Sequence, residues 1–268
     1  MKNIILIIVI AMTAISCSEK INLKLDDSAQ KIVIEGLITN ETKAHTIKIT
    51  KSTSYFSDEP APAVTGANVT INDGTLIYHL NETSAGIYQT DSNFAGVVGK
   101  TYVLNISYNG ESYSASSLLK FVPQIDSITC KLFDSPFGHE QNIYEVDLWA
   151  QEPEPSGDYY LWNVYKNNVL YSDTLNKVAY SDDSFINGNY AAGIMILQVK
   201  AFPGDTVMLE MLSISKEYFN FLNDVLTESS GGSNPFSGPP ANVKGNISNG
   251  ALGFFLAAAV SSKSCIIK

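Results

Sequence analysis

The chain has 268 residues, of which 45% are hydrophobic and 16% charged, so it can bury the core of one large or two ordinary domains. Its near-neutral mean hydropathy excludes a multi-span membrane protein and a disordered tail. The net charge is −10 and every basic residue is Lys, which excludes the basic face that nucleic-acid binding requires.

The first segment has the layout of a bacterial lipoprotein signal. Lys2 precedes an apolar run from Ile4 to Met12, and small residues then lead to Cys17. The run is too short to span a bilayer comfortably, which favours a cleaved signal peptide over residues 1–16. We therefore expect Cys17 to carry acyl chains, each buried methylene of which contributes about 0.8 kcal/mol to membrane binding. An ordinary signal peptide with a chance Cys is the alternative.

Residues 17–28 are expected to be the lipidated Cys and a polar tether. From residue 29 to residue 122, short alternating segments predict an immunoglobulin- or fibronectin-like β-sandwich. Asn109-Gly110 lies between two such segments and predicts a two-residue hairpin turn. Tyr102 is expected either to form a tyrosine corner or simply to begin a strand.

Alternation restarts after Pro123, so residues 123–268 are expected to form a second antiparallel β domain. Asn167-Asn168 predicts another hairpin turn, and Pro203-Gly204-Asp205 predicts a turn between two strands. One helix is expected near residues 215–229, because apolar residues repeat there at helical spacing after the capping residue Ser215.

The sequence contains no recognisable catalytic motif, so we expect neither an enzyme nor a cofactor. The histidines are few and far apart, which argues against a metal site of that kind. Oxygen-bearing residues at 182–184 and 187–189 could hold Ca²⁺, but their spacing does not fit an EF-hand and a polar turn is favoured. Cys130 and Cys265 could pair in an oxidising compartment; two separate buried thiols are the alternative.

Aromatic residues are the better indication of binding. Tyr55 and Phe56 lie in a Pro-rich loop, where aromatic side chains commonly anchor partners. Trp149 lies on the same face of its predicted strand as the acidic residues Glu145 and Asp147 and could face solvent. Tyr55, Phe56 and Trp149 are therefore the candidate ligand- or partner-binding residues, with folding back onto the core as the alternative for each.

Short sequence pieces, in this order along nearly the whole chain, carry a resemblance to a known family. They are Cys17 with its preceding small residues, Ile34-Glu35-Gly36, Ser54-Tyr55-Phe56, Gly66-Ala67-Asn68-Val69, Gly86-Ile87-Tyr88, Phe94-Ala95-Gly96, Pro203-Gly204-Asp205-Thr206-Val207, Asn234-Pro235-Phe236, Gly245-Asn246-Ile247 and Gly250-Ala251-Leu252-Gly253. In these pieces the chain resembles a Bacteroidota lipoprotein family catalogued as domain of unknown function 4249.

The resemblance implies an outer-membrane lipoprotein, typically encoded beside a TonB-dependent transporter. We therefore expect a non-catalytic accessory or solute-capture subunit of such a transporter, with the cell-surface face favoured over the periplasmic face. A stand-alone surface adhesin that binds glycan or protein is the alternative. The expected partners are the membrane, through the acyl chains, and the transporter.

Overall fold

The computed structural model describes residues 30–53, 59–133, 141–230 and 243–268. The described residues do not include the predicted signal, Cys17, the tether, Tyr55 or Phe56. Residues 31–268 form one compact unit. Within the described residues, no helix combines the length and the apolar character needed to cross a bilayer.

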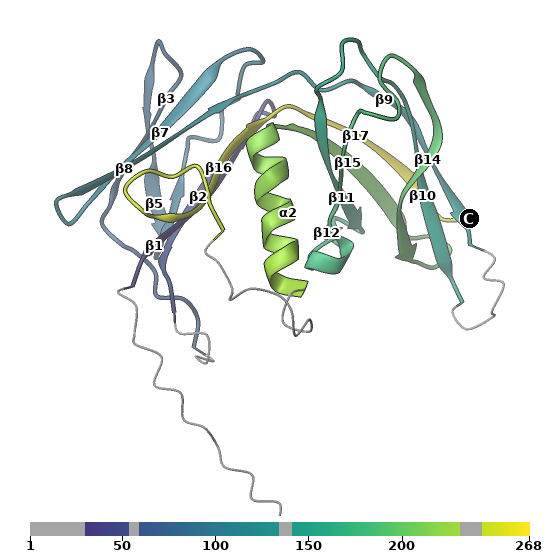
Figure 1. The fold of residues 1–268 in the computed structure, drawn as a ribbon. Helices are drawn as coiled ribbons and strands as arrows, with labels where there is room; N and C mark the ends of the chain where they lie inside the picture. The colour runs from purple at the N-terminus through teal and green to yellow at the C-terminus, as the bar shows by residue number, and fades with distance from the viewer. Residues whose placement is uncertain (1–29, 54–58, 134–140, 231–242) are drawn as a thin grey trace, which may run out of the picture. The chain divides into compact units, whose positions relative to one another are not determined.

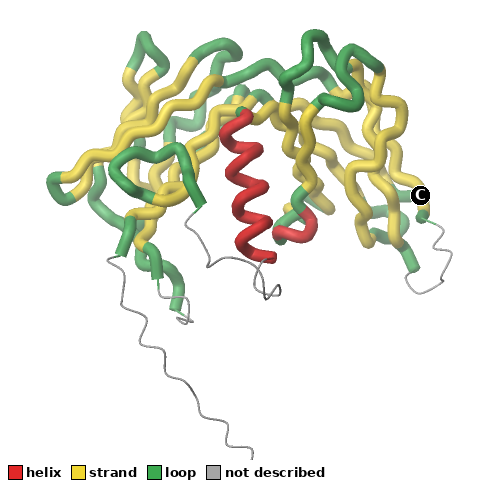
Figure 2. Tube along the Cα trace, viewed as in Figure 1, coloured by secondary structure: helices red, strands yellow, loops and turns green. Residues whose placement is uncertain are grey.

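The fold is mainly β, with α2 (Lys216–Ser230) as the one long helix among the described residues (Figures 1 and 2). A short 3-10 helix, η1, covers Leu175–Lys177. The strands are β1 (Ile32–Thr39), β2 (Thr46–Lys51), β3 (Asn68–Asn72), β4 (Ile77–His79), β5 (Asn81–Ser84), β6 (Ile87–Gln89), β7 (Thr101–Tyr108), β8 (Glu111–Leu118), β9 (Ile125–Leu132), β10 (Ile143–Gln151), β11 (Tyr159–Lys166), β12 (Val169–Leu170), β13 (Ala179–Asp182), β14 (Tyr190–Lys200), β15 (Thr206–Ile214), β16 (Leu252–Ala258) and β17 (Val260–Ile266).

These strands form four sheets. The first sheet has the order β16-β1-β2-β6-β5, and the second has the order β4-β3-β7-β8. The third sheet is β14-β10-β9, and the fourth is β12-β11-β15-β17 with β13 also paired to β11. The first sheet packs on the second through β16 and β8, and the third packs on the fourth through β9 and β17; we call these the first and the second sandwich. Buried side chains of all four sheets belong to one hydrophobic cluster, and the mainly β, sandwich-like class with one helix is confirmed.

Local turn chemistry forms the hairpins at the predicted places. Asn109 and Gly110 have φ angles of 50° and 82° between β7 and β8, and Asn167 and Asn168 have φ angles of 50° and 64° between β11 and β12. In each turn both central residues have φ > 0, as a type I′ turn requires. Tyr102 is buried and its hydroxyl accepts a 2.7 Å bond from the Val97 N–H, which is the tyrosine-corner arrangement.

The helix begins as its sequence predicts. The Ser215 hydroxyl accepts a hydrogen bond from the Tyr218 N–H at 3.1 Å, so it satisfies one of the free donors of the first turn. Glu217 adds a negative charge in the same turn, where the helix dipole favours it.

The C-terminal strands connect the two halves of the chain. β16 pairs in parallel with β1, and after Ala259 the chain continues as β17, which pairs with β15 of the fourth sheet. The division expected between residues 122 and 123 is therefore crossed, because a strand from the second half lies at the edge of the first sheet. Figure 1 shows the consecutive strands β16 and β17 in yellow, running from one sheet to the other.

Cys130 and Cys265 form a disulfide. It joins β9 of the third sheet to β17 of the fourth, so it links the two layers of the second sandwich across a sequence separation of 135 residues.

A second apolar cluster packs α2 against the outer faces of two sheets. Leu222 of α2 is buried with Leu212 and Ile214 of β15, and with Phe254 and Leu256 of β16. The residues of β16 that alternate with these, such as Phe255, face the first sandwich core instead. The helix therefore fills the angle between the first and fourth sheets.

Candidate functional site

A pocket of about 510 Å³ lies beside α2, between the first and fourth sheets; we call it the inter-sheet cleft. Strand alternation places its side chains, because successive residues point to opposite faces of a sheet. From the first sheet it is lined by Glu35, Leu37, Thr46 and Lys48.

The helix and β16 give the cleft an apolar side. Tyr218 and Phe221 of α2 contact Phe254 of β16, with ring centroids 4.8 Å and 5.3 Å from it. Tyr218 and Phe221 also stack on each other at 5.8 Å. Aromatic groups packed at these distances form a rigid apolar wall.

The fourth sheet gives the cleft a polar group. Asn163 on β11 lines the cleft and pairs in register with Glu210 on β15. The Asn163 amide donates to Glu210 Oε2 at 2.8 Å, and the Tyr165 hydroxyl donates to the same oxygen at 3.3 Å. Burial, followed by the nearby Glu210 charge, raises the pKa of Tyr165 to about 12, so this hydroxyl stays protonated and remains a donor.

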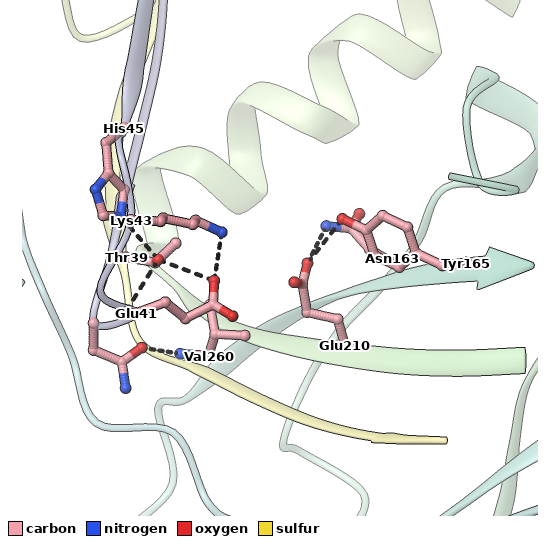
Figure 3. Close-up of polar contacts among 9 residues, drawn as sticks. Thr39, Glu41, Lys43, His45, Asn163, Tyr165, Glu210 and Val260 are labelled. Atoms are coloured by element: carbon pink, nitrogen blue, oxygen red, sulfur yellow. Dashed lines mark hydrogen bonds and ion pairs between the residues drawn. The ribbon is translucent and has the colours of Figure 1, made fainter. Parts of the chain in front are cut away.

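The loop between β1 and β2 carries the facing polar residues (Figure 3). Glu41 pairs with Lys43, and in the figure both side chains point toward the group formed by Asn163, Tyr165 and Glu210. The negative charge of Glu41 also contributes to the raised pKa of Tyr165, which agrees with this proximity. The loop is tied to the junction of β16 and β17, because Asn40 Oδ1 accepts a 2.8 Å bond from the Val260 N–H.

His45 supports this loop from behind. It is buried, its Nε2 lies 3.0 Å from the Thr39 hydroxyl, and that hydroxyl donates to Glu41 at 3.3 Å. Burial, followed by the charge of Lys43, lowers the pKa of His45, so the imidazole is neutral at pH 7. The arrangement fixes Glu41 through a hydroxyl rather than presenting His45 to the cleft.

In the two segments considered for Ca²⁺, some of the carboxylate oxygens accept hydrogen bonds from the protein itself. Asp182 Oδ1 accepts from the Ser184 hydroxyl at 2.7 Å, and Asp183 Oδ2 accepts from the Gly157 N–H at 2.9 Å. Asp183 also lies in an acidic cluster with Glu152 and Asp158. Acidic side chains alone do not define a metal site, and we assign none here.

Trp149 lies away from the inter-sheet cleft, on the third sheet. Its ring is half-buried, against Gly193. Its Nε1 donates to the Thr129 hydroxyl at 3.3 Å, and Thr129 donates in turn to Asp147, which also pairs with Lys131 at 2.8 Å. Asp147 is buried, and these contacts satisfy its carboxylate. The structure does not bring Trp149 into the cleft.

The cleft residues were not among the sequence-predicted site residues. The available signal was a polar residue inside an apolar strand: Asn163 interrupts the segment Tyr160–Val164, and Glu210 interrupts Val207–Leu212. The sequence could not show that the two positions are paired.

The fold and site define a mainly β protein of two sandwiches, with a helix-bordered cleft between two sheets. The sequence profile of the family described as "Domain of unknown function (DUF4249)" matches residues 18–264. The chain belongs to this family. A search of curated proteins gave no match.

Proposed function

We propose that the chain is a lipid-anchored outer-membrane protein that captures a solute in the inter-sheet cleft, as a non-catalytic accessory subunit of a TonB-dependent transporter. The observation that carries the capture role is the cleft itself, which has a volume in the range of ligand sites. The lipoprotein-like leader before Cys17 supports the anchor, and the cell-surface face is the favoured side.

The lining of the cleft suggests the kind of solute. An apolar body would pack on Phe221, Phe254 and Leu37, while a polar group would reach the Asn163 side chain, which also lines the cleft. The charged lining residues, Glu35 and Lys48, form an ion pair at 3.5 Å, so the lining favours a neutral solute over a charged one.

The first experiment tests the transporter. The acylated protein would be purified from outer membranes in mild detergent, and the co-purifying proteins identified by mass spectrometry. We expect a TonB-dependent transporter in stoichiometric amount. Recovery of the lipoprotein alone would contradict the accessory role. Cys17→Ser is the control for the anchor and should leave the protein without acyl label and outside the membrane fraction.

The second experiment tests the cleft. Leu37→Trp places a large ring in the cleft, whereas Leu118→Trp makes the same change on β8; the two leucines are 37% and 43% exposed. Small molecules that co-purify with the protein from its envelope would be measured by mass spectrometry. We expect wild type and Leu118→Trp to retain a solute that Leu37→Trp has lost. Equal retention by all three proteins would contradict capture in the cleft.

The alternative is a stand-alone surface binder of glycan or protein that uses Tyr55, Phe56 and Trp149. It predicts binding of the isolated protein to a glycan array, with loss of that binding in Trp149→Ala, and no transporter in the pull-down. The two experiments therefore separate the two proposals.

A further inference from the structure

A second pocket, of about 430 Å³, lies in the second sandwich and shares no lining residue with the inter-sheet cleft. β13 and the turn after it form one side, and β14 forms the other. Leu148 of β10 and Trp162 of β11 also line it. We call it the Trp162 pocket.

The lining of this pocket is mostly apolar. Its side chains include Leu148, Ile186, Ile196 and Leu197. Its exposed large apolar members are Phe185, Met195 and Ile194, at 94%, 51% and 36% exposure. Exposed large apolar side chains around a hollow are typical of a site that takes an apolar ligand.

Irregular strand pairing places part of this lining. The register between β10 and β14 shifts twice, once between Val146 and Asp147 and once between Leu148 and Trp149. On β14 these shifts leave Ile196 and Gly193 without partners, on either side of the pair Ile194–Met195. Such bulges redirect neighbouring side chains and are frequent beside binding sites.

Gly193 is required at one of these irregularities. Its φ is +75°, and a Cβ there would lie 3.0 Å from Cζ2 of Trp149. The Trp149 ring therefore supports the bulge from the outer face of the sheet, which gives this residue a structural role beside the pocket.

Trp162, which lines the pocket, carries an unused hydrogen-bond donor. Trp162 is only 7% exposed, and its Nε1–H is buried with no acceptor among the described residues. Buried donors are nearly always paired, because an unpaired one loses its hydration without compensation. By contrast, the indole N–H of Trp149 is paired with Thr129.

We propose that the Trp162 pocket binds a neutral, mainly apolar molecule through one hydrogen-bond acceptor, such as a ketone, ester, amide or ether oxygen, which accepts from Trp162 Nε1–H. A carboxylate is disfavoured because Asp182 also lines the pocket and the chain carries a net charge of −10. This site is independent of the cleft and of the proposed transporter role.

The test uses prodan, a neutral naphthalene dye with one ketone, and its analogue in which a propyl group replaces the propionyl group. Binding to the purified protein would be followed by dye fluorescence. We expect saturable binding of both dyes to wild type. Trp162→Phe keeps an apolar ring but removes the donor, so it should weaken prodan binding about tenfold and leave binding of the ketone-free analogue unchanged.

Trp149→Phe is a background for tryptophan fluorescence rather than a binding control, because Trp149 supports the bulge beside the pocket. It makes Trp162 the one remaining tryptophan, so its emission should fall as prodan binds. Retained binding of the analogue by Trp162→Phe shows that this variant is folded. Absence of saturable prodan binding to wild type, or equal prodan affinity in wild type and Trp162→Phe, would overturn the proposal.

Discussion

Asn163 and Glu210 lie directly opposite each other on β11 and β15, and the Asn163 amide donates a 2.8 Å hydrogen bond to Glu210 Oε2. Both side chains are polar within apolar strands, and Glu210 is buried. The pair therefore satisfies two groups that would each be costly to bury alone.

Removing one partner should cost more than removing both. Glu210→Leu leaves the Asn163 amide without its acceptor and should lower the free energy of unfolding by about 1–3 kcal/mol. The double variant Asn163→Leu/Glu210→Leu should recover part of that loss. Urea unfolding of the two single variants and the double variant measures the coupling. A double variant that is destabilised by the sum of the two single effects would show that the pair does not interact.

The disulfide should contribute to stability in an oxidising compartment. Replacing Cys130 and Cys265 by Ser removes the bond between β9 and β17 and should lower the free energy of unfolding by about 2–4 kcal/mol. Urea unfolding with and without a reducing agent measures this effect. The reductant should destabilise wild type and leave the double variant unchanged; an unchanged wild type would mean that the bond is not formed.

Local features could be predicted from the sequence and non-local ones could not. The Asn109-Gly110 hairpin and the Ser215 cap depend on neighbouring residues, so their chemistry is visible in the chain itself. The apolar segment from Gly250 to Val260 pairs with β1, whose residues lie about two hundred positions away. No local pattern contains that information.

The same reasoning applies to the candidate site. Asn163 and Glu210 are 47 positions apart and meet because β11 and β15 pair in one register. Trp149 shows the same limit: it is half-buried, and Thr129 and Gly193, which cover it, come from two other strands. Exposure of a strand residue depends on such neighbours as well as on its own position.

The parallel pairing of β16 with β1 should depend on Gly253. This residue has φ +94°, and a Cβ there would lie 2.1 Å from the carbonyl oxygen of Ile34. Gly253→Ala should therefore cost more than about 2 kcal/mol, because the strand must move away from β1. Gly74→Ala is the control: its φ is +87° but nothing lies within 4 Å, so only the backbone strain of about 1 kcal/mol applies. Equal melting temperatures for the two variants would contradict this account.

Glu152 should make stability depend on pH in an unusual direction. Burial, with smaller contributions from the charges of Asp158 and Asp183, raises its pKa to about 7, while the Tyr160 hydroxyl donates to it at 2.9 Å and opposes the rise. Because the folded protein holds this proton more tightly than the unfolded chain, the stabilisation is complete below the unfolded pKa of about 4.5 and is lost as the pH rises to about 7.

Glu152→Gln cannot ionise, so it should remove this part of the pH dependence. We expect the variant to match wild type near pH 4.5 and to exceed its stability above pH 7 by roughly 3 kcal/mol. Tyr160→Phe should act in the opposite direction, because loss of the donor raises the pKa of Glu152 further and moves the pH-dependent loss upward. Urea unfolding at a series of pH values measures all three proteins. Parallel curves for wild type and Glu152→Gln would show that Glu152 does not titrate in this range.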